Sequence, residues 1–165
     1  MQAFVIDAFE FCQVKDRREG DIAVANLPRL AEDTVDRAGQ VSWVLQGAID
    51  RSGHSRLNLS VSATVHLMCQ RCLTPLAFKV ASESTLILAK DEAGIDEIEA
   101  MLPDDSIDVI AGGQSLNIAE LIEDEVLLAI PQSPKHEVCP DQAALEALKG
   151  AKKPSPFDVL KNIKQ

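Results

Sequence analysis

The sequence predicts an α+β fold: an antiparallel β-sheet of about four to six strands, with a helix packed on one face and short flanking helices. The clearest evidence is residues 57–67, where apolar side chains alternate strictly with polar ones, as in a strand with one buried and one solvated face. The best helix is predicted over residues 117–130. It begins behind Asn117, a capping residue, and Glu120 follows three positions later in a capping-box pattern.

Shorter patterns predict the remaining strands. Apolar residues recur at period two over residues 41–49 and over residues 76–89. Residues 107–110 can add a short strand, and a looser alternation over residues 3–11 could form a first strand. Together with residues 57–67, these segments account for the predicted sheet.

Short helices are expected on either side of the sheet segments. Asn26 followed by Leu27 and Pro28 is typical of a helix start, and this helix would end near Gly39. Residues 141–149 suggest a further short helix. In the main helix the acids Glu120, Glu123 and Asp124 are expected to form a solvated face, because a run of charges on a helix usually faces water.

The length and the charge pattern indicate one domain with a tail. A chain of 165 residues can bury one core, which we assign to residues 1–148. Within it the acidic segment of residues 91–105 is expected to be a mobile insertion, because it has little apolar area to offset the entropy of ordering. Residues 149–165 are expected to form a linker and a short basic amphipathic tail.

Several features favour a cytoplasmic protein. No apolar run approaches the roughly 20 residues that cross a bilayer, and the first ten residues lack the basic and small-residue signals of a secretory leader. The chain has four cysteines, which in an unexported protein favour thiols or a metal site over disulfides.

The net charge of −10 opposes extensive contact with nucleic-acid phosphates. The charge is uneven, however, because residues 51–79 contain no acid. Their candidate contacts to nucleic acid or to a protein partner are Arg56, His66, Arg71 and Lys79. The competing interpretation is that this polar strand face is merely solvated or covered by the N-terminal helix.

Four residues have the spacing of a metal site. Cys69 and Cys72 form a C-x-x-C directly after a predicted strand, and His136 and Cys139 repeat the two-residue gap after the main helix. Two such pairs match the ligand pattern of tetrahedral zinc, with three thiolates and one imidazole. One structural zinc ion is therefore a candidate cofactor.

Two other interpretations of the cysteines stay open. Cys69 and Cys72 could be ordinary buried thiols, since free cysteine is among the most buried residue types. A redox pair is the third interpretation, but such pairs normally lie at a helix N-terminus, whereas this one follows an antiparallel strand.

The sequence offers little that suggests catalysis. It has no glycine-rich phosphate loop, and its Ser, His and Asp residues lack a nucleophile-elbow context. A zinc site closed by four protein ligands would also leave no position for a reactive water. We therefore expect a protein that is not an enzyme and takes no small-molecule substrate.

Four motifs occur in an order that resembles the YceD family of large ribosomal RNA subunit accumulation proteins. They cover the C-terminal two-thirds of the chain: Cys69-Gln70-Arg71-Cys72, the EDEVLLAIP run of residues 123–131, Pro134-Lys135-His136 with Cys139, and Pro156-Phe157-Asp158-Val159-Leu160. The combination is specific, although each motif alone is weak.

The resemblance implies a bacterial protein, with plastid relatives, that is needed for accumulation of large-subunit ribosomal RNA. It also implies metal binding through Cys69, Cys72, His136 and Cys139, and a gene beside one for a zinc-ribbon-type protein of the large subunit. The expected function is an accessory factor of ribosome assembly that binds ribosomal RNA or a large-subunit ribosomal protein. The alternative is a protein-binding adaptor or regulator without RNA contact, which the net negative charge favours.

Overall fold

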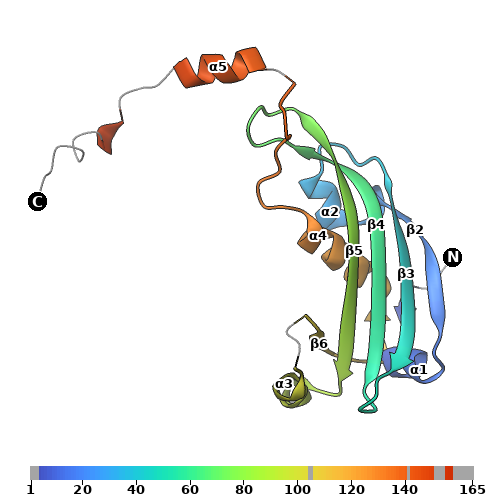
Figure 1. Ribbon diagram of the computed structural model, residues 1–165. Helices are drawn as coiled ribbons and strands as arrows, with labels where there is room; N and C mark the ends of the chain where they lie inside the picture. The colour runs from blue at the N-terminus through green and yellow to red at the C-terminus, as the bar shows by residue number, and fades with distance from the viewer. Residues whose placement is uncertain (1–3, 104–105, 141, 151–154, 158–165) are drawn as a thin grey trace, which may run out of the picture.

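The computed structural model describes residues 4–103, 106–140, 142–150 and 155–157 (Figure 1). A five-stranded sheet has the strand order β2 (Arg17–Ala23), β3 (Gln40–Ile49), β4 (Ser55–Met68), β5 (Pro75–Ala89) and β6 (Asp108–Ala111). A separate two-stranded ladder joins β1 (Val5–Ile6) to β7 (Leu116–Asn117). The fold is therefore α+β, as the sequence predicts.

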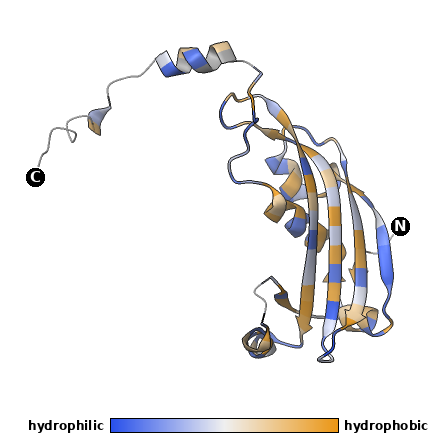
Figure 2. Ribbon diagram, in the orientation of Figure 1, coloured by the Kyte–Doolittle hydropathy of each residue, from blue (hydrophilic) through white to orange (hydrophobic). Residues whose placement is uncertain are grey.

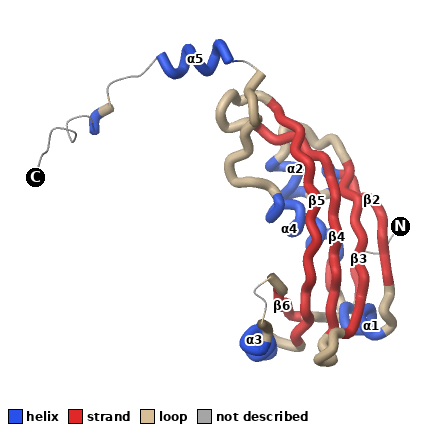
Figure 3. Tube along the Cα trace, viewed as in Figure 1, coloured by secondary structure: helices blue, strands red, loops and turns tan. Residues whose placement is uncertain are grey.

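Helices cover one face of the sheet and leave the other face open (Figures 1 and 3). The helices of the covered face are α1 (Ala8–Gln13), α2 (Pro28–Asp33) and α4 (Ile118–Ala129), together with the 3-10 turn η1 (Val24–Asn26). Helix α3 (Glu92–Met101) lies at one end of the sheet beside β6, and α5 (Gln142–Gly150) stands clear of the sheet beyond its other end (Figure 1). None of the helices within the described residues is long and apolar enough to cross a membrane.

Three central strands confirm the period-two patterns. Along β4 the alternate residues Leu57, Leu59, Val61, Val65 and Leu67 are buried, while the residues between them are partly or fully exposed. The striping of hydropathy along β3, β4 and β5 is visible in Figure 2. These side chains form one core with the buried face of α4, where Ile118, Ile122 and Val126 recur at helical spacing. The apolar face of the strands and the apolar face of α4 therefore pack against each other in one hydrophobic layer.

The sheet is not wholly antiparallel, which corrects the sequence prediction at one edge. The segment 107–110 does form a strand, but β6 pairs with β5 in parallel register, Val109 facing Ile87. A parallel pair needs a crossover connection, and helix α3 supplies it. The acidic segment expected to be mobile thus contains a helix, capped by the Asp91 carboxylate, which accepts from the Gly94 amide at 2.8 Å. Its mobility stays a prediction.

The N-terminal third departs most from the sequence prediction. The expected strand over residues 3–11 is wrong beyond Ile6, because the Asp7 carboxylate caps a helix by accepting from the Phe9 and Glu10 amides. Strand β2 was not predicted. Its sequence, RREGDIA, has four charged residues and buries only Ile22, which fits an edge strand with an open polar face and gives no period-two signal. The expected helix after Asn26 begins at Pro28 but ends at Asp33, well before Gly39.

Helix α2 has no side-chain cap of its own, and α4 supplies one. The N-cap residue is Leu27 rather than Asn26. The Glu123 side chain, only 4% exposed, accepts from the Leu30 amide at 3.0 Å and from Arg29 Nε at 2.9 Å. Arg29 also donates from Nη1 to Asp124 at 2.6 Å. The expectation that these acids form a solvated face is therefore wrong for Glu123, which is buried and joins two helices.

The next acid, Glu125, joins α4 to the sheet. Its carboxylate accepts a hydrogen bond from the Ser82 hydroxyl on β5. At the start of α4, Asn117 Oδ1 accepts from the Ala119 amide at 3.0 Å, which confirms the predicted cap. Glu120 accepts from the Asn117 side-chain amide at 3.0 Å, so it supports the capping residue directly. The acids of α4 thus position this helix against α2 and β5.

The predicted helix of residues 141–149 is confirmed as α5, and Asp141 lies outside the described residues. The linker and tail expected over residues 149–165 fall mainly on residues 151–154 and 158–165, which also lie outside the described residues. The assignment of residues 1–148 to one domain is not tested further by these elements and stays a prediction.

We predict that replacing Glu123 by Ala lowers the free energy of unfolding by about 1–3 kcal/mol, because the buried Leu30 amide loses its acceptor. Glu123→Gln retains one acceptor oxygen and should cost less. Asp124→Ala is the matched control on the same helix, since its pair with Arg29 is exposed to solvent. Urea unfolding of the three variants measures the difference, and equal losses for Glu123→Ala and Asp124→Ala would contradict the capping role.

Candidate metal centre

The structure brings together the four residues that the spacing singled out. Cys69 and Cys72 lie in the turn between β4 and β5, while His136 and Cys139 lie in the segment after α4. Their four ligand atoms all lie within 4.8 Å of one another. We call this group the Cys3His cluster. The chain between the two pairs is long, so the cluster joins two distant parts of the sequence at one end of the sheet.

The distances in the cluster fit a tetrahedral ion. Cys69 Sγ lies 3.9 Å from Cys139 Sγ, and Cys72 Sγ lies 3.4 Å from His136 Nδ1. Zn–S bonds of about 2.3 Å and Zn–N bonds of about 2.0 Å place two tetrahedral sulfurs roughly 3.8 Å apart and a sulfur and a nitrogen roughly 3.5 Å apart. The cluster is thus compatible with holding one metal ion between its four donors.

Backbone hydrogen bonds hold the turn that carries the first two cysteines, which we call the knuckle (residues 69–74). The Cys69 amide donates to the Thr74 carbonyl at 3.0 Å, and the Leu73 amide donates to the Cys69 carbonyl at 2.9 Å. The Gln70 amide donates across to the Pro134 carbonyl at 2.8 Å, which fixes the second pair beside the first. The positions of the donors are therefore set by the backbone as well as by any bound ion.

The second ring nitrogen of His136 is also placed. Nε2 lies 3.2 Å from the Pro75 carbonyl oxygen, which can only accept, so the proton of a neutral ring belongs on Nε2. Nδ1 is then left unprotonated and directed at the cluster. An outer hydrogen bond of this kind is the usual way in which a metal-binding histidine is oriented.

The thiols of the cluster differ in pKa: those of Cys69 and Cys72 are lowered and that of Cys139 is raised. Burial alone would raise the pKa of Cys69, but the amides of Cys72, His136 and Arg71 point at its sulfur and lower the pKa to about 5. The Thr74 hydroxyl, 3.0 Å from Cys72 Sγ, lowers the pKa of Cys72. Cys69 is therefore prepared as a thiolate, the form that binds metal.

The pKa values of Cys139 and His136 depend in part on the neighbouring Cys69. Burial, and then the neighbouring cysteines, raise the pKa of Cys139 to about 11. Hydrogen bonding to Cys69 raises the pKa of His136. Three thiols this close cannot all ionise unless a cation compensates their charge, so full ionisation of the cluster requires a bound cation. The fourth cysteine, Cys12, is buried elsewhere and its thiol donates to the Arg56 carbonyl at 3.3 Å.

The four candidate contact residues do not form one surface. Arg71 is exposed on the knuckle, and Lys79 is exposed on β5 opposite Thr64. His66 lies near the same end of β4, with Nδ1 3.2 Å from the Asp36 carboxylate. Arg56 lies at the other end of β4, twelve residues or roughly 40 Å from Met68, and is only partly exposed. A small partner can contact Arg71 and Lys79 but not Arg56 as well.

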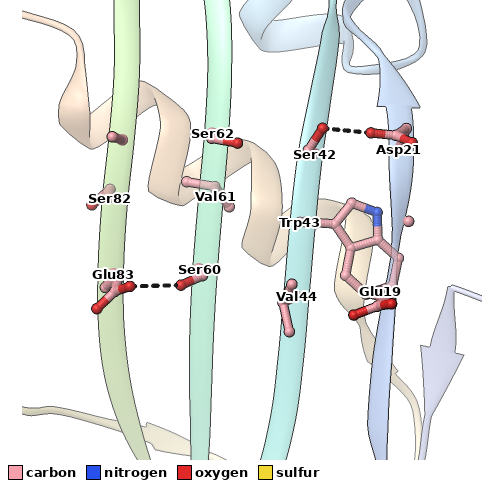
Figure 4. A pocket seen from close by; sticks show the side chains of 12 residues that line it. Glu19, Asp21, Ser42, Trp43, Val44, Ser60, Val61, Ser62, Ser82 and Glu83 are labelled. Carbon is pink, nitrogen blue, oxygen red and sulfur yellow. Dashed lines mark hydrogen bonds between the residues drawn. The ribbon is translucent and has the colours of Figure 1, made fainter.

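The open face of the sheet contains a shallow pocket with an acidic border (Figure 4). Its floor carries small side chains from β3 and β4, among them Ser42, Ser60 and Ser62. Asp21 on β2 accepts from Ser42 at 2.5 Å, and Glu83 on β5 accepts from Ser60 at 3.2 Å. The segment without acids is therefore bordered by acids of neighbouring strands. The middle of this face is unsuited to phosphate.

Sequence reasoning missed two exposed apolar side chains beside the cluster. Leu73 is 69% exposed and Val138 is 71% exposed, one from each cysteine-containing segment. Leu73 also has φ of +56°, a left-handed conformation that costs a branched side chain energy. A signal for Leu73 was available, because Leu73 directly follows Cys72 in the short connection between two predicted strands.

We predict that Leu73→Asn raises the free energy of unfolding by a few tenths to about 1 kcal/mol, because Asn tolerates the left-handed conformation and Leu73 buries little. Leu73→Val should lower it, since a β-branched residue is more strained there. Urea unfolding with metal content held constant is the measurement. A loss of stability in both variants would show that the Leu73 side chain contributes packing instead.

The chain is similar to known proteins over most of its length. A family model described as "Large ribosomal RNA subunit accumulation protein YceD" matches residues 57–164. A protein of Haemophilus influenzae with the same name is 30% identical over 154 residues, which cover 88% of this chain and 86% of the relative. The chain has no significant match among solved structures. The matched residues include both halves of the Cys3His cluster and helix α4, and the chain belongs to the YceD family of large ribosomal RNA subunit accumulation proteins.

Proposed function

We propose that the protein is a non-enzymatic accessory factor for accumulation of large-subunit ribosomal RNA, and that it binds ribosomal RNA or a large-subunit ribosomal protein in the cytoplasm. The observation that supports this most is the family match over residues 57–164, which spans β4, the knuckle, α4 and the second ligand pair. The relative in Haemophilus influenzae is named for the same role and matches over most of both chains.

The cofactor that fits best is one structural zinc ion on Cys69, Cys72, His136 and Cys139. Three sulfurs and one imidazole nitrogen are a donor set that zinc accepts, and four protein donors close a tetrahedral site. The ion would bind the segment after α4 to the turn between β4 and β5. Because all four positions would be filled by the protein, the site supports a structural role and no reaction.

The surface that we assign to the partner is the knuckle end of the sheet. Arg71 and Lys135 are exposed there, one in each of the two segments that carry the ligand pairs. Leu73 and Val138 add apolar contact area, and the strain at Leu73 indicates that its position serves something other than the fold. Lys79 and His66 lie nearby on β5 and β4, whereas the distant Arg56 is left out of this surface.

The alternative is an adaptor that binds only protein. Two observations favour it: the net charge of −10, and the two exposed apolar side chains at the knuckle. Apolar contact suits a protein surface, whereas RNA phosphates require cations. Both proposals place the partner at the same end of the molecule, and the two differ in the salt dependence of binding.

The zinc proposal predicts about one zinc per chain in protein purified without chelator. Chelation should lower Tm by roughly 10 °C, because it releases the long connection between the two ligand pairs. Cys139→Ala should abolish metal retention, while Cys12→Ala, which changes a buried cysteine outside the cluster, should retain it. Native, folded protein that is purified without chelator and contains no metal would refute the proposal, whereas the buried thiol of Cys12 should be unreactive in either case.

The binding proposal predicts that Arg71→Ala weakens binding to large-subunit ribosomal RNA and reduces the salt dependence by about one unit of slope. Arg56→Ala, at the far end of β4, is the matched control and should bind as the wild type does. Metal content should not change in Arg71→Ala, because Arg71 contacts Cys69 Sγ through its backbone amide at 3.4 Å.

Fluorescence anisotropy at several salt concentrations measures the slope, and pull-down of large-subunit ribosomal proteins tests the adaptor. Binding to a ribosomal protein that is insensitive to salt, with no RNA binding, would favour the adaptor. Loss of binding in Arg56→Ala alone would contradict the assignment of the surface.

A further inference from the structure

Strand β5 has a long outer edge that no described strand covers. Its inner side pairs with β4 along almost its whole length. On the outer side β6 pairs only with residues 86–89, so residues 76–85 have no strand partner among the described segments of the chain (Figure 1). An edge of this length presents a row of backbone donors and acceptors, and natural proteins normally shield such edges.

The charges on this edge are arranged symmetrically. On the open face of the sheet Lys79 and Glu83 lie two positions on either side of Ala81, and all three side chains are exposed. Two copies of β5 paired antiparallel about Ala81 would place Lys79 of each copy opposite Glu83 of the other. Opposite charges directly across an antiparallel pair stabilise it, and like charges destabilise it. The pattern is therefore complementary to itself.

The charge pattern also selects one register. A shift that centred the pair on Lys79 would place two ammonium groups opposite each other, and centring it on Glu83 would oppose two carboxylates. With Ala81 at the centre, the paired segment runs from Ala77 to Thr85, which falls within the uncovered part of the edge. The small Ala81 side chain at the axis allows the two copies to approach without a clash.

Helix α4 presents an exposed apolar side chain on the side facing this edge. Glu125 accepts from Ser82 of β5, which places that flank of α4 beneath the strand. Leu128 follows three positions later on the same flank and is 81% exposed. A second β5 laid along the edge would cover part of this side chain.

We propose that the outer edge of β5 pairs with the same edge of a second copy of this chain, antiparallel about Ala81, and joins the two sheets into one. The interface is isologous, as in most dimers, with the twofold axis at Ala81. The inference is independent of the ribosomal role, because it uses only the uncovered edge, its charges and Leu128.

The first test is a charge swap in the full-length protein, followed by sedimentation velocity over a range of concentrations. The wild type should sediment as a dimer at high concentration. Lys79→Glu or Glu83→Lys alone opposes like charges twice in each dimer and should raise the dimer Kd by about tenfold or more. The double variant Lys79→Glu/Glu83→Lys exchanges the charges and should restore the wild-type Kd.

Matched controls change the same charges elsewhere. Lys149→Glu on α5 and Glu32→Lys on α2 alter the net charge equally at exposed positions outside β5 and its neighbour β6, and should leave the Kd unchanged. A Kd that follows net charge in these controls would overturn the proposal. So would a wild-type protein that remains monomeric at every concentration, or a double variant that stays as weak as the single ones.

The second test is a disulfide at the proposed axis. Paired Cα atoms in an antiparallel ladder lie about 4.5–5.5 Å apart, which falls within the range that a disulfide spans. Ala81→Cys should therefore give a cross-linked dimer with a mild oxidant such as copper–phenanthroline. Ala77→Cys should not, because its own copies would lie eight residues, or roughly 26 Å, apart. Equal cross-linking of the two variants, or of the wild type, would overturn the register.

Discussion

The buried carboxylate of Glu123 is the contact on which the arrangement of helices depends. It completes the N-terminus of α2 through the Leu30 amide and holds Arg29, while Asp124 and Glu125 extend the contacts to Arg29 and to Ser82 on β5. Three consecutive acids thus fix α4 from two sides over the sheet. Because burying an unpaired carboxylate is costly, the partners must be in place when α4 packs. The acids of the EDEVLLAIP run therefore have a structural role.

The position of α4 in turn determines where the segment that carries His136 and Cys139 begins. The helix ends at Ala129, and the following segment reaches the turn between β4 and β5, where the Gln70 amide binds the Pro134 carbonyl. The Cys3His cluster then closes a connection of more than sixty residues. Closing such a long connection costs conformational entropy. The contacts of the cluster and of the α4 acids, at two different places, offset this cost. The Cys3His cluster and the docking of α4 thus support the same tertiary contact.

The open face of the sheet is divided along its length. Its middle is bordered by Asp21 and Glu83, and its knuckle end carries Arg71 with the exposed Leu73 and Val138. A chain of net charge −10 can contact a nucleic acid only where its acids are distant, and the knuckle end meets that condition better than the middle.

The elements with long and regular hydrophobic patterns could be predicted from local sequence alone. Residues 57–67 had to form a half-buried strand and residues 117–130 a helix, because no other local structure buries their apolar side chains together. The spacing of the ligand pairs likewise indicated the Cys3His cluster, since two residues between donors suit one ion. Three other features became visible only in the folded protein. The parallel direction of β6, the burial of Glu123 and the acids around the open face depend on which strands and helices become neighbours. Which elements become neighbours depends on contacts between residues far apart in sequence, and a local sequence pattern does not contain that information.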